Sequence, residues 1–295
     1  MKIIVLGAAA GGGFPQWNAA NPNNVRAFAG DTNTPHQTQA SLAVSADGKS
    51  WLLLNASPDL RQQIIATPEL HPKSPPRSSP IKAIVLTGAD VDALTGLLSL
   101  RERQPLTVWA SDYVLKVIAA NALFGVLDPS LVEHRPLPSA PAEVLPGLTV
   151  EAFPAPGKPP LYLERLEGIG PALGASSGLR LRDAAGKSLI FLPSCAEPSS
   201  EILRAIDGTD VLFFDGTMYT DDEMVRAGEG AKTARRMGHM AMIDTIDALK
   251  TVNVGARYFI HINNSNPVLN RTAPERKAVE AAGWHIAEDG MRIKL

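Results

Sequence analysis

Residues 83–101 read Ala-Ile-Val-Leu-Thr-Gly-Ala-Asp-Val-Asp-Ala-Leu-Thr-Gly-Leu-Leu-Ser-Leu-Arg. The apolar run over residues 83–87 predicts a buried strand, and two carboxylates, Asp90 and Asp92, follow it before a second apolar segment. In α/β folds, side chains just past strand ends converge above the sheet edge, where ligands bind. We therefore interpret the two acids as candidate metal ligands. The alternative is that they only cap the turn or helix that follows.

On both sides of this stretch, apolar runs alternate with turn signals in two successive halves of the chain. Strands are predicted at residues 2–6, 41–45, 51–55, 83–87, 106–110, 148–153, 179–182, 188–193, 211–214 and 257–262, and helices at 113–123, 199–206, 240–251 and 274–283. This order indicates an α/β layered fold. A chain of 295 residues with 45% hydrophobic content can bury one large core, so residues 1–295 are expected to form a single domain.

The composition argues against several classes of protein. A net charge of −2 and a pI near 6.3 give no basic surface for nucleic acid. The single cysteine, Cys195, excludes an intramolecular disulfide framework and sites with several thiolates. The apolar run after Lys2 is too short for a signal sequence or a membrane span. We expect a cytoplasmic protein without a nucleic-acid or membrane partner.

Seven short segments, spread over almost the whole chain, carry a resemblance to a known family. They are Val-Leu-Gly at 5–7, Ala-Ala-Gly-Gly-Gly-Phe-Pro-Gln-Trp-Asn at 9–18, Leu-Leu-Asn-Ala-Ser-Pro-Asp at 53–59, Gly-Leu-Leu-Ser-Leu-Arg-Glu at 96–102, Phe-Asp-Gly-Thr at 214–217, Met-Gly-His at 237–239 and Ile-His-Ile-Asn-Asn-Ser-Asn-Pro at 260–267. In this order they resemble the coenzyme PQQ (pyrroloquinoline quinone) synthesis protein B family of the metallo-β-lactamase superfamily. The resemblance implies a four-layer αββα sandwich.

The resemblance also implies a metal site. The superfamily turn His-x-His-x-Asp-His aligns with the strand-end acids so that Asp92 keeps its residue type, whereas Gly88 and Ala93 stand where histidines are usual. His261 matches the last metal ligand of the superfamily. The predicted ligands are therefore Asp90, Asp92 and His261, which would hold at most one divalent metal, iron or zinc, and hold it weakly.

Asp215 and His239 are predicted to act as a catalytic pair. His239 is similar to the histidine of a Gly-His segment in the tRNA-processing branch of the superfamily, where it pairs with an upstream acid, and Asp215 lies where that acid would be. A carboxylate can fix the tautomer of an imidazole that moves protons. A structural pair that orients the start of a helix is an equally open interpretation.

Four residues are predicted to bind substrate: Trp17, Arg235, Asn263 and Asn264. Trp17 follows a triple glycine that permits tight turns beside a ligand, which we prefer over a dinucleotide loop because Pro15 would interrupt the required helix. Arginine binds carboxylates bidentately, and PQQ and its precursors are acids. The asparagines follow the strand that precedes His261, and the segment 154–161 is expected to lie over the site.

The sequence also departs from the family pattern. Three cysteines that hold a structural zinc in the family are replaced here by Ala19, Asn21 and Asn24, so this zinc is expected to be absent. Residues 174–180 and 192–197, where superfamily hydrolases place a histidine and a bridging aspartate, contain neither. A two-zinc hydrolase is therefore disfavoured.

Two functional hypotheses follow from the resemblance. In the first, the chain is a metal-dependent oxidase or hydroxylase that acts on a crosslinked Glu-Tyr precursor of PQQ. In the second, it is a carrier or transport protein that holds PQQ or a precursor without catalysis. Other PQQ-biosynthesis proteins are expected partners, and a homodimer is left open.

Overall fold

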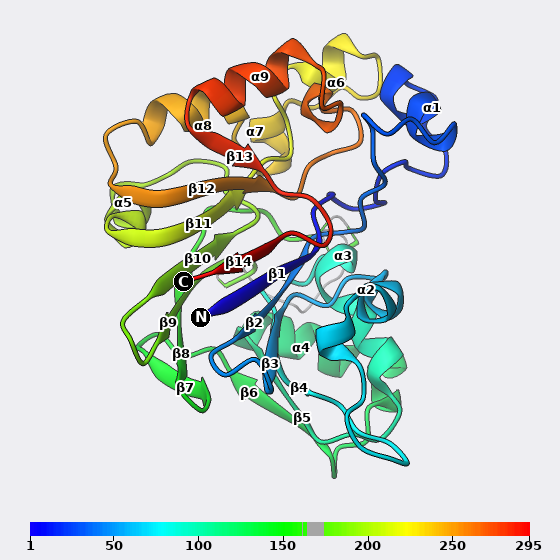
Figure 1. The fold of residues 1–295 in the computed structure, drawn as a ribbon, viewed down its shortest axis with the longest axis vertical. Helices are drawn as coiled ribbons and strands as arrows, with labels where there is room; N and C mark the ends of the chain where they lie inside the picture. Colours follow the sequence, from blue (N-terminus) through cyan, green and yellow to red (C-terminus); the bar gives the residue numbers. More distant parts are fainter. Residues whose placement is uncertain (161, 164–173) are drawn as a thin grey trace.

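Two seven-stranded mixed sheets form the centre of the protein (Figure 1). The computed structural model describes residues 1–160, 162–163 and 174–295. The first sheet contains, in spatial order, β14 (Arg292–Lys294), β1 (Lys2–Gly7), β2 (Ser41–Ser45), β3 (Trp51–Leu54), β4 (Ile81–Val85), β5 (Leu106–Ala110) and β6 (Val132–Pro136). The second contains β13 (Trp284–Ile286), β12 (Val254–Ile260), β11 (Thr209–Asp215), β10 (Ser188–Leu192), β9 (Ser177–Asp183), β8 (Leu148–Pro154) and β7 (Ala142–Leu145).

The two sheets share one pairing pattern. In the first, β14, β1, β2 and β3 pair antiparallel, and β3, β4, β5 and β6 pair parallel. In the second, β7, β8, β9 and β10 pair antiparallel, and β10, β11, β12 and β13 pair parallel. The chain is thus built from two similar halves. In each half the parallel strands carry their carboxyl ends to one edge, and functional loops follow there.

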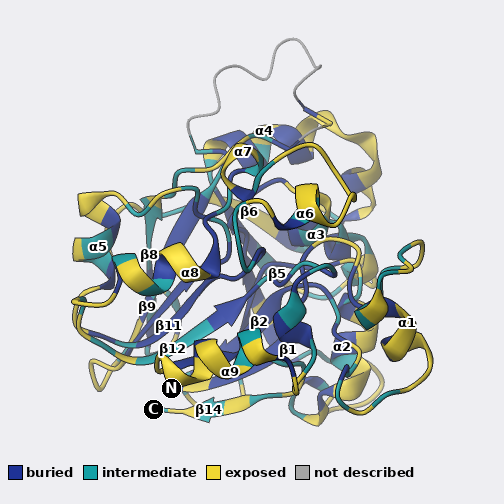
Figure 2. Ribbon diagram, turned by 90° about the horizontal axis from the view of Figure 1, so that it is seen from above, coloured by how far each residue is buried: buried dark blue, intermediate teal, exposed yellow. Residues whose placement is uncertain are grey.

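Helices cover the outer faces of both sheets. They are α1 (Pro22–Phe28), α2 (Leu60–Ala66), α3 (Val91–Leu94), α4 (Asp112–Ala120), α5 (Ser200–Ile206), α6 (Glu223–Arg226), α7 (Ala234–Met237), α8 (Met242–Ala248) and α9 (Pro274–Ala281), with short 3₁₀ turns at Pro68–Leu70, Thr95–Leu100, Ala122–Val126 and Pro267–Leu269. One apolar core lies between the sheets; a second joins the first sheet to α2, α3 and α4; a third joins the second sheet to α5, α8 and α9. Figure 2 shows the buried strands inside and the exposed helix surfaces outside.

This arrangement confirms the predicted four-layer αββα metallo-β-lactamase fold. The predicted elements exist, but some predicted ends were wrong. The strand predicted over 83–87 ends at Val85, because the Asn55 side chain accepts hydrogen bonds from the Thr87 amide (2.9 Å) and hydroxyl (3.0 Å) in place of a neighbouring strand. The helix predicted over 113–123 ends at Ala120, because the Asn121 side chain caps a separate 3₁₀ turn.

The helices are short, and α4 with nine residues is the longest in the described ranges. None of the helices in this described part of the chain combines the length and the apolarity that crossing a membrane would require.

Candidate active site

A cavity of about 420 Å³ opens beyond the ends of β4, β11 and β12. Its lining includes two of the three predicted acids, both predicted histidines and three cations, namely Asp90, Asp92, His239, His261, Lys158, Lys232 and Arg236. A second hollow of about 460 Å³ lies beside Arg77 and Arg101, and its described lining contains no histidine. We therefore assign the candidate site to the cavity at the strand ends.

Asp92 and His261 meet at this cavity although 169 positions separate them. Asp92 lies in the first turn of α3, and His261 follows β12 with a left-handed backbone (φ 62°). The distance between Asp92 Oδ2 and His261 Nε2 is 2.8 Å. Burial opposes charge on both groups, yet their mutual hydrogen bond and attraction lower the pKa of Asp92 and raise the pKa of His261. Each of the two side chains therefore stabilises the charged form of the other.

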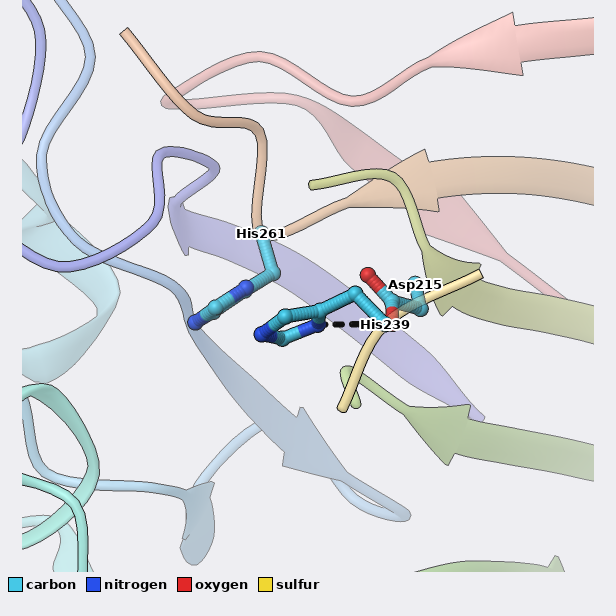
Figure 3. Close-up of side chains that lie close together, drawn as sticks. All are labelled: Asp215, His239 and His261. Carbon is cyan, nitrogen blue, oxygen red and sulfur yellow. Dashed lines mark hydrogen bonds and ion pairs between the residues drawn. The ribbon is translucent and has the colours of Figure 1, made fainter. Parts of the chain in front are cut away.

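Asp215 and His239 form a second pair (Figure 3). Asp215 is the last residue of β11 and is fully buried. Its carboxylate accepts hydrogen bonds from the Cys195 amide (2.9 Å), the Thr217 amide (3.0 Å) and hydroxyl (2.7 Å), and His239 Nδ1 (2.8 Å). Burial would raise the pKa of Asp215, but the charge and hydrogen bond of His239 outweigh it and lower this pKa. The structure thus holds His239 by its Nδ1 atom.

The two imidazole rings stack with centroids 5.5 Å apart and an interplanar angle of 22°. In Figure 3 both rings extend away from Asp215 toward the same side. Asp215, His239 and His261 each offer a ligand atom within 4.8 Å of those of the other two, so this group could hold a metal ion. Imidazole nitrogen with carboxylate oxygen is a donor set that suits zinc or iron, so the residues present fit the implied metal.

Asp90, the N-cap of α3, adds a second carboxylate to the cavity. Its surface is open to the cavity, but the surrounding protein removes enough water to raise its pKa to about 6, and the negative charge of Asp92 adds to this rise. The carboxyl group therefore changes charge near neutral pH, unlike that of Asp92.

Of the four predicted substrate-binding residues, Asn263 lines the cavity and the other three do not. Trp17 is 84% exposed. Arg235 is exposed on α7, and its backbone amide donates to Asp221 (2.9 Å). Asn264 is buried and serves a structural network instead. Its side-chain oxygen accepts hydrogen bonds from Asn24 (3.0 Å) and Asn21 (3.3 Å).

The loop that lacks the family's cysteines is thus ordered by amides. Asn21 caps α1 by accepting a hydrogen bond from the Asn24 amide (3.1 Å), and its side-chain oxygen also accepts one from the Asn24 side chain (2.8 Å). Asn24 in turn accepts a hydrogen bond from the Gln16 amide (2.7 Å). Asn21 and Asn24 therefore hold α1 against the loop after β12, because both side chains bond Asn264.

The sequence reasoning missed two kinds of residue at the site. Thr217 lines the cavity and contacts both histidines, and its position two residues after the strand-end acid was the available signal. Lys158 lines the cavity with Pro159 and Pro160, in agreement with the expectation for the segment 154–161, whose last residue lies outside the described ranges. The side chain of Lys158 donates to the carbonyl oxygen of Arg236.

Comparisons with known proteins agree with this geometry. The β-lactamase superfamily domain matches residues 50–262. Coenzyme PQQ synthesis protein B of Gluconobacter oxydans is 49% identical over 100% of this chain and 99% of its own, and that of Methylobacterium sp. (strain 4-46) is 50% identical over 100% of both. The crystal structure of Zn²⁺-bound PqqB from Methylobacterium extorquens covers 100% of both chains at 45% identity, with a TM-score of 0.96. A diphosphatase of the PhnP family (TM-score 0.70, 19% identity) shares the fold alone.

Proposed function

The chain belongs to the coenzyme PQQ synthesis protein B family of the β-lactamase superfamily and is a PQQ-biosynthesis protein; from this premise we propose that it is a metal-dependent hydroxylase of a PQQ precursor. One observation carries the proposal. Two carboxylate–histidine pairs meet at one cavity: Asp92, His261 and His239 line it together with three cations, and the buried Asp215 holds His239 from behind. Such a cavity can hold a metal ion, a base and an acidic substrate together.

Asp92 and His261 would hold the metal, with Asp90 beside them. A bound iron ion would supply the redox chemistry with molecular oxygen that no side chain provides. His239 is suited to move a proton, because its Nδ1 atom is bound to Asp215 and its Nε2 atom has no hydrogen-bond partner among the described residues. Asp215 fixes the imidazole in this orientation.

The cations Lys158, Lys232 and Arg236 would bind the carboxylates of the precursor, a crosslinked Glu-Tyr compound. Arg236 has the role that the sequence suggested for its neighbour Arg235, because Arg236 lines the cavity. Asn263 would add a side-chain amide, and its backbone amide donates to the Thr217 carbonyl oxygen (3.0 Å), which fixes its place in the wall.

The proposal is tested by anaerobic titration of metal-free protein with ferrous iron, read as iron retained after desalting. We expect stoichiometric iron that is lost in Asp92→Ala and His261→Ala but kept in Asp112→Asn, an exposed acid on α4. Iron-loaded protein, precursor, oxygen and a two-electron reductant such as ascorbate should then give a product heavier by one oxygen atom, with the second oxygen atom released as water. Full iron retention by His261→Ala would contradict the ligand assignment, and unchanged precursor would contradict the activity.

A second candidate function is a carrier of PQQ or its precursor. The observation that favours it is the ligand set itself, since Gly88 and Ala93 contribute no imidazole to the strand-end turn. Equilibrium dialysis of metal-free protein with PQQ distinguishes the two. Tight binding by protein that retains no iron, abolished in Arg236→Ala, would support the carrier and displace the hydroxylase.

A further inference from the structure

The hydroxyl of Thr217 lies at the centre of the histidine cluster. Thr217 follows the end of β11 by two residues and is 5% exposed. Its Oγ1 atom lies 2.7 Å from Asp215 Oδ1, 3.0 Å from His239 Nδ1 and 2.9 Å from His261 Nδ1. One hydroxyl thus contacts a carboxylate and both imidazoles.

The bonding capacity of a hydroxyl restricts how these three contacts can be made. A threonine hydroxyl has one proton to donate and two lone pairs that accept. Asp215 already accepts from the backbone amides of Cys195 (2.9 Å) and Thr217 (3.0 Å), so it is an acceptor toward the hydroxyl as well. The hydroxyl proton therefore belongs to the contact with Asp215, and both lone pairs remain for the histidines.

Each histidine must then donate from Nδ1. For His239 the same conclusion follows independently, because its Nδ1 atom also lies 2.8 Å from Asp215 Oδ2, another acceptor. With the opposite assignment, a buried hydroxyl oxygen would face a carboxylate oxygen at 2.7 Å with no proton between them, which is strongly unfavourable.

We propose that Thr217 is a positioning residue that fixes the Nδ1–H form of both His239 and His261 and so presents both Nε2 atoms to the cavity. The convergence of Nδ1 atoms on this hydroxyl implies that a metal ion binds on the Nε2 side, where His261 Nε2 already lies 2.8 Å from Asp92 Oδ2. The protonation of both Nδ1 atoms follows from hydrogen bonding alone. In metal-free protein Asp92 also accepts a hydrogen bond from His261 Nε2, so that Nε2 proton leaves when a metal ion takes its place. Only this use in metal binding rests on the proposed function.

The decisive measurement is whether Nδ1 of each histidine carries a proton in metal-free protein labelled with ¹⁵N-histidine, read from two-bond proton–nitrogen correlations. In the wild type and in Thr217→Ser we expect a protonated Nδ1 on both rings. In Thr217→Val, His261 should lose this signature, because Thr217 is the partner of its Nδ1 atom in the described structure, whereas His239 should keep it through Asp215. Thr245→Val, which removes a buried hydroxyl bonded to Ala241 in α8, is the matched control.

Zn²⁺ affinity of the same variants, measured by competition with a chelator, gives a second readout. Loss of a group that orients a ligand typically weakens a metal site by about 10–100-fold, so we expect that loss in Thr217→Val and near-complete recovery in Thr217→Ser. An unprotonated Nδ1 on either ring of the wild type, or an unchanged His261 in Thr217→Val, would overturn the proposal. Failure to hydroxylate the precursor would refute the proposed function but would not affect the protonation of the Nδ1 atoms. If Thr217→Val does not fold, the wild-type and Thr217→Ser spectra still show whether both Nδ1 atoms carry a proton.

Discussion

Replacement of Asn24 by alanine tests whether amides hold the loop that has no cysteines. The Asn24 side chain is fully buried, donates to Asn21 Oδ1 (2.8 Å) and Asn264 Oδ1 (3.0 Å), and accepts from the Gln16 amide (2.7 Å). A net value of about 1 kcal/mol for each of these hydrogen bonds gives about 3 kcal/mol. The Gln16 amide would lose this acceptor, and Asn264 Oδ1 would keep the longer bond from Asn21 (3.3 Å), so we expect Asn24→Ala to lower the free energy of unfolding by about 2–4 kcal/mol.

The assay is urea unfolding monitored by circular dichroism, with Asn18→Ala as the control. Asn18 is exposed and bonds only the Gln16 side chain in the described structure (3.2 Å), so its loss should change the free energy of unfolding by less than about 0.5 kcal/mol. A destabilisation of Asn24→Ala as small as that of the control would show that the amides do not order this loop, and our account of how the loop is held would fail.

Three further predictions concern other parts of the molecule. Because the pKa of Asp90 is raised to about 6, its carboxyl group gains its charge as the pH rises through 6. Zn²⁺ affinity, measured by chelator competition, should therefore rise more steeply through pH 6 in the wild type than in Asp90→Asn. Equal slopes would exclude Asp90 from the site. In Gly96→Ala the new Cβ would lie 2.1 Å from the Ser57 carbonyl oxygen, so thermal unfolding should show a loss of about 3 kcal/mol or more, and a wild-type melting temperature would contradict this packing. Lys187 lowers the pKa of Asp210 to about 2, so the charged carboxylate stabilises the fold above its unfolded pKa, and this gain is lost as the pH falls from about 4 to about 2. The difference in the free energy of unfolding between wild type and Asp210→Asn, about 0.2–1 kcal/mol, should therefore vanish over that range. A difference that stays constant would show that charge is not its source.

The extent to which the fold could be predicted depended on burial. Strands β3 and β10 lie at the centres of their sheets and read as apolar runs, which the sequence pattern detects. β6 was not predicted, because it is an edge strand and four of its five residues are exposed, so its sequence, Val-Glu-His-Arg-Pro, carries no apolar pattern. β13 and β14 have three residues each, which is too short for any period to show. Their pairing depends on contacts from distant parts of the chain.

Residues of the candidate site could be predicted where polar side chains follow the end of a strand. Asp92 and His261 could be assigned to one site because each lies in the segment that follows a buried strand and the resemblance to a family supplied the frame. Arg235 was predicted but its neighbour Arg236 lines the cavity, because which of two adjacent residues on a single helical turn faces the cavity depends on how α7 is docked. Asn264 has the composition of a ligand-binding residue, but its partners come from α1 and its N-cap, a contact between distant segments that no local pattern reveals.

At His261, which has a left-handed backbone, selection for stability and selection for metal binding favour different residues. Glycine adopts φ near 62° with less strain than a residue with a side chain, so relief of the backbone and retention of the imidazole cannot both be optimised at this position. In a saturation library screened only for thermal tolerance, glycine should therefore be enriched among the substitutions at 261. A library screened for metal uptake should keep histidine. Directed evolution that starts with selection for stability would thus remove the imidazole from the site before its activity had been measured.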